Sequence, residues 1–152
     1  MPRRRTRGFT LVEVIAVVAL IALAATVVAV SVGGGLSGAR VRAASKDLAA
    51  ALRYTRGQAI VEREQKTLLL DLENRSYTAP DREPVELPQG MEIRLVTARQ
   101  ELEGEGAGRI RFFPDGSSSG GRITLVRGEA EWQIEVEWLT GKVVLRDPAG
   151  EQ

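Results

Sequence analysis

Residues 3–32 read RRRTRGFTLVEVIAVVALIALAATVVAVSV, a cluster of arginines followed by a long apolar run. From Val14 to Val30 the only polar residue is Thr26. At about 1.5 Å per residue the whole run is long enough to cross a bilayer as a helix, so we expect a transmembrane helix over residues 9–32. Because the arginines precede this helix, the preference of positive charge for the cytoplasm places the N-terminus inside and the rest of the chain outside.

Glu13 is the unusual residue in this run, because an unpaired carboxylate in hydrocarbon costs a few kcal/mol. A removable secretory signal peptide, cut near Ala22-Leu23-Ala24, does not account for it, since the charge weakens insertion and the apolar run continues to Val32. A simple signal anchor has no use for the glutamate either. A third interpretation is that cleavage falls before the apolar run and leaves it on the mature protein.

A specific sequence motif supports the third interpretation. Residues 7–13, RGFTLVE, resemble the cleavage motif of type IV prepilins and type II secretion pseudopilins: a basic leader ending in Gly, then Phe, a small hydroxyl residue, two aliphatic residues and Glu. The resemblance implies that residues 1–8 are a leader, that a prepilin peptidase cuts between Gly8 and Phe9, and that the new amine of Phe9 is methylated. Glu13 then becomes the fifth residue of the mature chain.

At that position the carboxylate of Glu13 can face the terminal ammonium of a neighbouring subunit in a filament of packed helices. A subunit in register gains this ion pair, whereas a subunit out of register leaves two unpaired charges in hydrocarbon. We therefore expect Glu13 to set the assembly register. The alternative is a charge that merely snorkels to the membrane interface.

The composition restricts the chemistry of the rest of the chain. There is no Cys and no His, which removes thiol nucleophiles, Cys/His zinc sites and histidine acid–base catalysis. We expect no enzyme, no cofactor and no metal. The residues after the leader carry 17 basic and 20 acidic groups, a formal net charge of −3, so we expect no nucleic-acid binding.

A glycine triplet separates the apolar run from a second helical pattern. Gly33-Gly34-Gly35 weakens a helix by about 1 kcal/mol per residue relative to Ala, so residues 33–39 are expected to form a hinge. Apolar and small side chains then recur at three- and four-residue spacing, which predicts an amphipathic helix over residues 40–65. Its predicted buried stripe is Val41, Ala44, Leu48, Ala51, Leu52, Thr55 and Ala59.

After Gln65 the pattern changes to short β-rich segments between turn residues, so residues 66–147 are predicted to be a β-sheet domain and residues 148–152 a tail. The predicted strands are 67–72, 76–79, 91–96, 109–113, 122–127, 131–139 and 142–146.

Local patterns add detail to this domain. Strict alternation predicts that every second side chain from Trp132 to Trp138, Ile134 and Val136 included, faces inward. Turns predicted at Arg127–Ala130 and Thr140–Gly141 would make the last three strands an antiparallel meander. The Gly- and Glu-rich segment 101–108 is predicted to be a solvated loop.

A second resemblance concerns this domain. Residues 109–125, RIRFFPDGSSSGGRITL, together with LTGKVVL at 139–145, resemble the C-terminal domain of the H-type minor pseudopilins of type II secretion and of their type IV pilus relatives. The resemblance implies an α+β, pilin-like fold in which a long N-terminal helix packs on an antiparallel β-sheet domain. The Pro-Asp-Gly segment at 114–116 is expected to form a tight turn and not a phosphate or metal site.

By this resemblance the chain is a minor pseudopilin, a structural subunit near the tip of the periplasmic pseudopilus that supports protein export across the outer membrane. The implied partners are the prepilin peptidase, the other minor pseudopilins, the major pseudopilin and the inner-membrane secretion platform. The implied location is the bacterial inner membrane, with one span, a cytoplasmic N-terminus and a periplasmic C-terminal domain. The alternative is a minor pilin of the type IV pilus, acting in assembly or DNA uptake.

Overall fold

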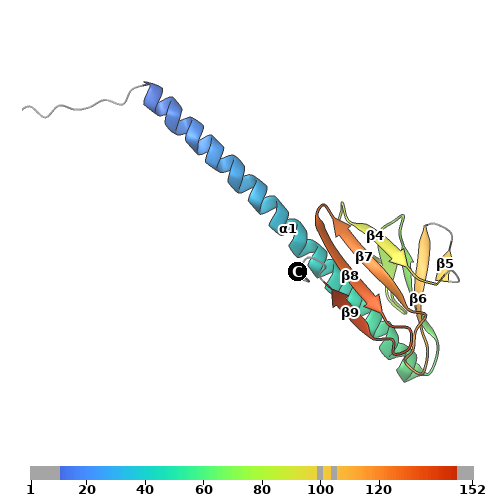
Figure 1. Ribbon diagram of the computed structural model, residues 1–152. Coiled ribbons are helices and arrows are strands. Elements are labelled where there is room, and N and C mark those ends of the chain that lie inside the picture. The colour runs from blue at the N-terminus through green and yellow to red at the C-terminus, as the bar shows by residue number, and fades with distance from the viewer. Residues whose placement is uncertain (1–10, 99–100, 104–105, 147–152) are drawn as a thin grey trace, which may run out of the picture. The chain divides into compact units, whose positions relative to one another are not determined.

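The computed structural model describes residues 11–98, 101–103 and 106–146, with the side chains of residues 25–37 and of Glu103 left out. In this part the chain has one helix and nine strands (Figure 1). It divides into two compact units, Met1–Leu36 and Ser37–Gln152. The predicted leader, its cleavage site at Gly8 and Phe9, and the predicted tail lie outside the described residues.

The helix α1 spans Leu11–Glu62 and includes Gly33, Gly34 and Gly35. The boundary between the two units falls within the predicted hinge segment, but bending there stays a prediction. Within the part of the chain that the structure describes, no helix is long and apolar enough to cross a membrane. The transmembrane helix expected over residues 9–32 stays a prediction.

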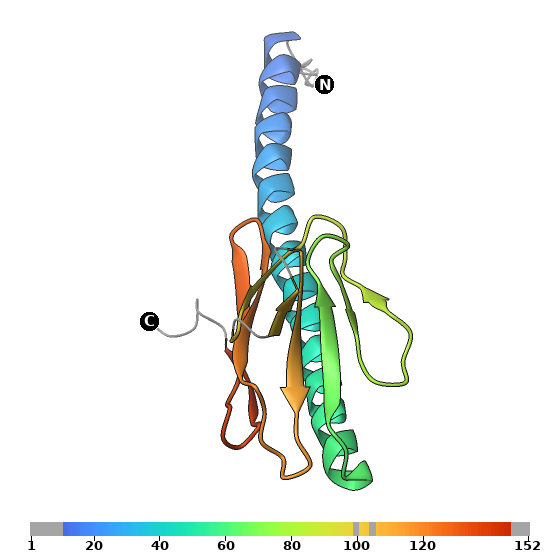
Figure 2. The same ribbon diagram turned by 90° about the vertical axis from the view of Figure 1, so that its right-hand side faces the viewer.

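In the second unit α1 buries one face against the strands, as Figure 2 shows. The predicted stripe is confirmed except at Ala51, which is only half-buried, and Ser45 and Ala49 join it. Because these positions recur every three or four residues, they lie on one side of an α-helix.

The strands of the β-sheet domain form two antiparallel sheets. The first sheet has the order β3-β2-β1-β6-β5 and the second has the order β4-β7-β8-β9. The chain passes from the first sheet to the second between β3 and β4, through a turn in which Met91 N donates to Pro88 O at 3.3 Å and Gly90 adopts a positive φ of 75°. It returns to the first sheet for β5 and β6 and enters the second again at β7. The strands are β1 (Lys66–Asp71), β2 (Ser76–Thr78), β3 (Val85–Glu86), β4 (Glu92–Val96), β5 (Leu102–Glu103), β6 (Ala107–Phe112), β7 (Gly121–Arg127), β8 (Ala130–Val136) and β9 (Val143–Arg146).

One apolar core joins α1 to both sheets. Leu48 and Leu52 come from the helix, and the largest side chain with no exposed surface is that of Phe112 on β6. The other fully buried large side chains are those of Leu68, Leu70, Met91, Ile110, Ile123, Leu125, Ile134 and Val41.

The meander β7-β8-β9 is confirmed, with one of its two turns as predicted. Arg127 pairs with Ala130, so Gly128 and Glu129 form a two-residue hairpin, and the positive φ of Gly128 suits its first central position. The turn at Thr140–Gly141 is not a tight hairpin. The last strand pair is Val136 with Val143, and a six-residue loop connects them.

Two predictions about side chains were wrong. Trp138 does not face inward: it lies beyond the end of β8 and is 68% exposed. The segment 101–108 is not a solvated loop, because Glu101 is buried and the segment contributes β5 and the start of β6.

Candidate functional site

The start of α1 carries the first candidate, Glu13. It is exposed and lies in the first helical turn, where a carboxylate interacts favourably with the helix dipole. The large apolar side chains around it are exposed as well, and an apolar surface of this extent requires lipid or other protein segments to cover it. These side chains are Leu11, Val12, Val14, Ile15, Val17, Val18, Leu20, Ile21 and Leu23.

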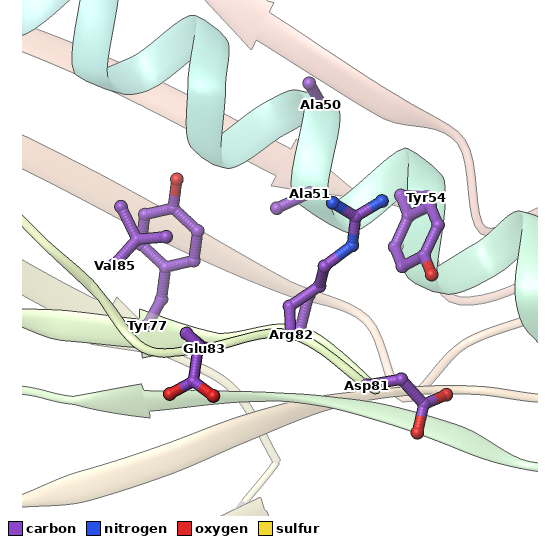
Figure 3. Close-up of a pocket in the computed structure, with 9 residues that line it drawn as sticks. Ala50, Ala51, Tyr54, Tyr77, Asp81, Arg82, Glu83 and Val85 are labelled. Carbon is purple, nitrogen blue, oxygen red and sulfur yellow. The ribbon is translucent and has the colours of Figure 1, made fainter.

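The second candidate is a groove of about 660 Å³ between α1 and the chain that follows β2 (Figure 3). Its floor includes the ring of Tyr77, which is buried. Burial, followed by the nearby carboxylate of Asp47, raises the pKa of Tyr77 above its ordinary value. The lining residues are Ala50, Ala51, Tyr54, Tyr77, Ala79, Asp81, Arg82, Glu83 and Val85.

Arg82 crosses this groove toward the helix, as Figure 3 shows. Its guanidinium lies over the ring of Tyr54, 4.8 Å from the centroid, as a cation–π contact. The backbone of the same loop is held by a hydrogen bond from Arg82 N to Ala79 O at 3.2 Å. The lining is a mixture of aromatic, aliphatic and charged side chains.

The third candidate is the pair of loops at residues 113–118 and 137–142. In the first loop Gly116 N donates to Phe113 O at 2.9 Å, which confirms the predicted tight turn at Pro-Asp-Gly. Asp115 Oδ1 accepts hydrogen bonds from the hydroxyl and the N–H of Ser117, at 2.6 and 2.9 Å. These bonds lower the pKa of Asp115 below its ordinary value. The turn is therefore fixed by its own side chains.

Arg56 of α1 connects the two loops. Its Nε donates to Gly116 O at 3.0 Å and to Thr140 O at 3.1 Å. Gly141 has a positive φ of 62° and packs against Gly116 O, so a Cβ there would collide with the first loop. Both loops are therefore held to the last turns of the helix.

The structure brings together only part of what the sequence singled out. Glu13 is described, whereas Gly8 and Phe9 lie outside the described residues. The contacts of Arg56 and of Arg82 were missed, because each joins segments more than 25 positions apart. A helix arginine and a loop arginine carry no local signal of such contacts.

Two family comparisons and a curated relative match the chain. The family described as type II transport protein GspH matches residues 44–140. The prokaryotic N-terminal methylation motif matches residues 3–29. Type II secretion system protein H of Xanthomonas campestris pv. campestris is 44% identical over 150 residues, which cover 97% of this chain and 89% of the relative.

Two solved structures share the fold at 11% sequence identity. The minor pseudopilin EpsH from the type 2 secretion system of Vibrio cholerae aligns with a TM-score of 0.58 over 74% of this chain and 99% of that chain. The type IV minor pilin FimU of Pseudomonas aeruginosa aligns with a TM-score of 0.54 over 72% of this chain and 90% of that chain. The predicted α+β, pilin-like fold is confirmed, although the fold is common to secretion and pilus proteins.

The choice between those two branches comes from the sequence comparisons. The family match covers most of the β-sheet domain, and the relative with 44% identity is a secretion protein. This family is structural, so the chain is not an enzyme. It carries a type IV prepilin-like N-terminus. The chain belongs to the GspH family of type II secretion minor pseudopilins.

Proposed function

We propose that a prepilin peptidase cuts this chain between Gly8 and Phe9 and methylates the new N-terminus. The mature chain is then anchored in the inner membrane through residues 9–32, with a cytoplasmic N-terminus and a periplasmic body. The observation that carries this proposal is the match of the N-terminal methylation motif to residues 3–29. The arginines before Gly8 support the same orientation.

The processed protein joins the short periplasmic pseudopilus near its tip. There it contacts the other minor pseudopilins, the major pseudopilin and the inner-membrane platform, and it supports protein export across the outer membrane. Membership of the GspH family supports this place in the system. The exposed apolar side chains between Leu11 and Leu23 are the surface that neighbouring helices and lipid would cover.

Glu13 sets the register of assembly. It is the only acidic residue before Ser37 in the sequence, so the mature N-terminal helix has one carboxylate in an apolar surface. The ammonium of Phe9 on a neighbouring subunit is a partner of opposite charge, and such a pair is stable in hydrocarbon only when both groups meet.

Mass analysis of the N-terminus tests the processing step. Protein from cells with an active prepilin peptidase should begin at N-methylated Phe9, and protein from cells without the peptidase should keep residues 1–8. Gly8→Ala should slow cleavage mildly, whereas Gly8→Glu should block it because a charged side chain stands at the scissile bond. A mature chain that begins at Ala25 would exclude the proposal.

A further inference from the structure

Two large apolar side chains stand exposed in the loop between β8 and β9: Trp138 is 68% exposed and Leu139 is 65% exposed. Val61, in the last turn of α1, is 77% exposed. The loop at residues 137–142, the neighbouring loop at residues 113–118 and the end of α1 lie at the same end of the body (Figures 1 and 2). Large exposed apolar side chains are candidates for an interaction surface, and Trp is enriched among the residues that dominate interface energy.

The loop that carries these side chains is held in place by the rest of the body. Ser118 N donates to Trp138 O at 2.8 Å, and Ser118 Oγ donates to Glu137 O at 3.0 Å. Arg56 binds Thr140 O from the helix side. Because the loop is already ordered, a partner would meet a preformed surface and lose little conformational entropy in binding it.

A groove of about 530 Å³ adjoins this loop and is positively charged. Arg53, Arg56 and Lys142 line it together with one carboxylate, that of Glu137, which gives a formal net charge of +2. The chain after the leader has a formal net charge of −3. The net charge of the groove is therefore opposite in sign to the net charge of the chain, and the groove is complementary to an acidic partner.

We propose that this end surface, defined as Trp138, Leu139 and the groove lined by Arg53, Arg56 and Lys142, docks a segment of another pseudopilin that combines carboxylates with aliphatic side chains. The inference rests on the proposed function. The body continues from the N-terminal segment at Ser37, and the end surface lies at the opposite end of its helix, near Glu62. In a filament of parallel subunits that end meets the next subunit.

Site-specific photo-crosslinking in cells that contain the secretion system tests this docking. A photoreactive phenylalanine derivative replaces Leu139 in the full chain, and a matched control places it at Glu92, whose side chain is 70% exposed and which pairs with Val126 at the opposite end of the second sheet. The position 139 variant should give an adduct with another pseudopilin, identified by mass spectrometry, and the position 92 variant should not. Equal adducts at both positions, or no adduct at 139, would overturn the proposal. An adduct at 139 with a second copy of this chain or with a secreted protein would overturn it as well.

Charge reversal separates the groove from general surface effects. Lys142→Glu and Trp138→Ala should each reduce the adduct at 139 by about tenfold or more, because a few interface residues carry most of the binding energy. Lys46→Glu, which reverses an exposed lysine elsewhere on α1, should leave it unchanged. Equal adduct yields in Lys142→Glu and Lys46→Glu would overturn the proposal that the positive charge of the groove binds the partner.

The N-terminal mass, measured on the same sample, distinguishes a failure of this docking proposal from a failure of the proposed function. A chain that begins at Phe9 and gives no adduct at 139 overturns this inference alone. A chain that keeps residues 1–8 overturns the proposed function and this inference with it.

Discussion

Glu101 Oε2 accepts a hydrogen bond from Arg109 Nε at 3.0 Å. The same oxygen accepts a second bond from Arg111 Nη2 at 3.2 Å. Only 8% of the Glu101 side chain is exposed, so the carboxylate depends on these two guanidiniums, which project from alternate positions on one face of β6. The pair holds the chain that leads into β5 against the first sheet.

Glu101→Gln should destabilise the body by about 1–3 kcal/mol, because it removes the charge that compensates two partly buried guanidiniums. Urea unfolding of a fragment from Ser37 to Gln152, which keeps the core and both sheets, measures this change. Glu92→Gln is the control. It lies beside Arg94 with most of both side chains exposed, and its effect should stay within about 0.5 kcal/mol. Similar losses in the two variants would contradict the assigned role of Glu101.

The two tryptophans should differ sharply in their effect on stability. Trp132 packs against the core and its ring faces the guanidinium of Arg42 at 5.5 Å, so Trp132→Ala should cost about 2–4 kcal/mol. Trp138→Ala should change the free energy of unfolding by less than about 0.5 kcal/mol, because its side chain is exposed. Thermal melting of the same fragment compares them, and a large loss in Trp138→Ala would show that its ring packs on the body after all.

Trp138 also shows where sequence reasoning reaches its limit. Alternation correctly predicts the inward side chains of Ile134 and Val136, because it follows from strand geometry alone. The strand ends at Val136, and beyond it Ser118, a residue from another loop, donates hydrogen bonds to the carbonyls of Glu137 and Trp138. No pattern within residues 131–139 predicts these contacts.

The same difference between local patterns and contacts from distant residues applies to the rest of the chain. The buried stripe of α1 depends on helical spacing within one segment, so the sequence suffices to predict it. Glu101 lies in a Gly- and Glu-rich segment that reads as a loop, and its burial depends on the arginines of another strand. The N-terminal motif is different again, because it is a local sequence pattern that matches residues 3–29 without any contact from the fold, and cleavage at Gly8 stays a prediction.

Glu135 should make stability depend on pH. A hydrogen bond from Arg146, at 2.8 Å, and a second one from Arg122 lower its pKa below the ordinary value near 4.5. The unfolded chain therefore binds this proton more readily, so the stabilisation is present above about pH 4.5 and is lost as the pH falls through the lowered pKa.

The measurement for Glu135 is the urea midpoint of the wild type and of Glu135→Gln across about pH 3–7, a range that spans the ordinary titration of a glutamate. The wild type should be more stable at the upper end by a few tenths of a kcal/mol, since both arginines are about half exposed. The two curves should converge at the acidic end, and salt should reduce the difference. A gap that widens on acidification would show that the ion pairs are not its source.

Glu13 provides the test of assembly. Glu13→Ala should leave cleavage largely intact, because the peptidase acts at the Gly8–Phe9 bond and insertion is easier without a charge. Assembly should fail, since the ammonium of a neighbouring Phe9 loses its counter-charge, a penalty of several kcal/mol where that group is buried.

Glu13→Gln keeps size and hydrogen bonding without the charge, and Glu13→Asp keeps the charge on a shorter side chain, so the two variants separate the effect of charge from the effect of side-chain length. Co-purification with the other pseudopilins, together with secretion from the same cells, is the measurement. Failure in Ala and Gln with partial function in Asp supports the register pair, whereas normal assembly and secretion in both Ala and Gln would reduce Glu13 to a tolerated interfacial charge.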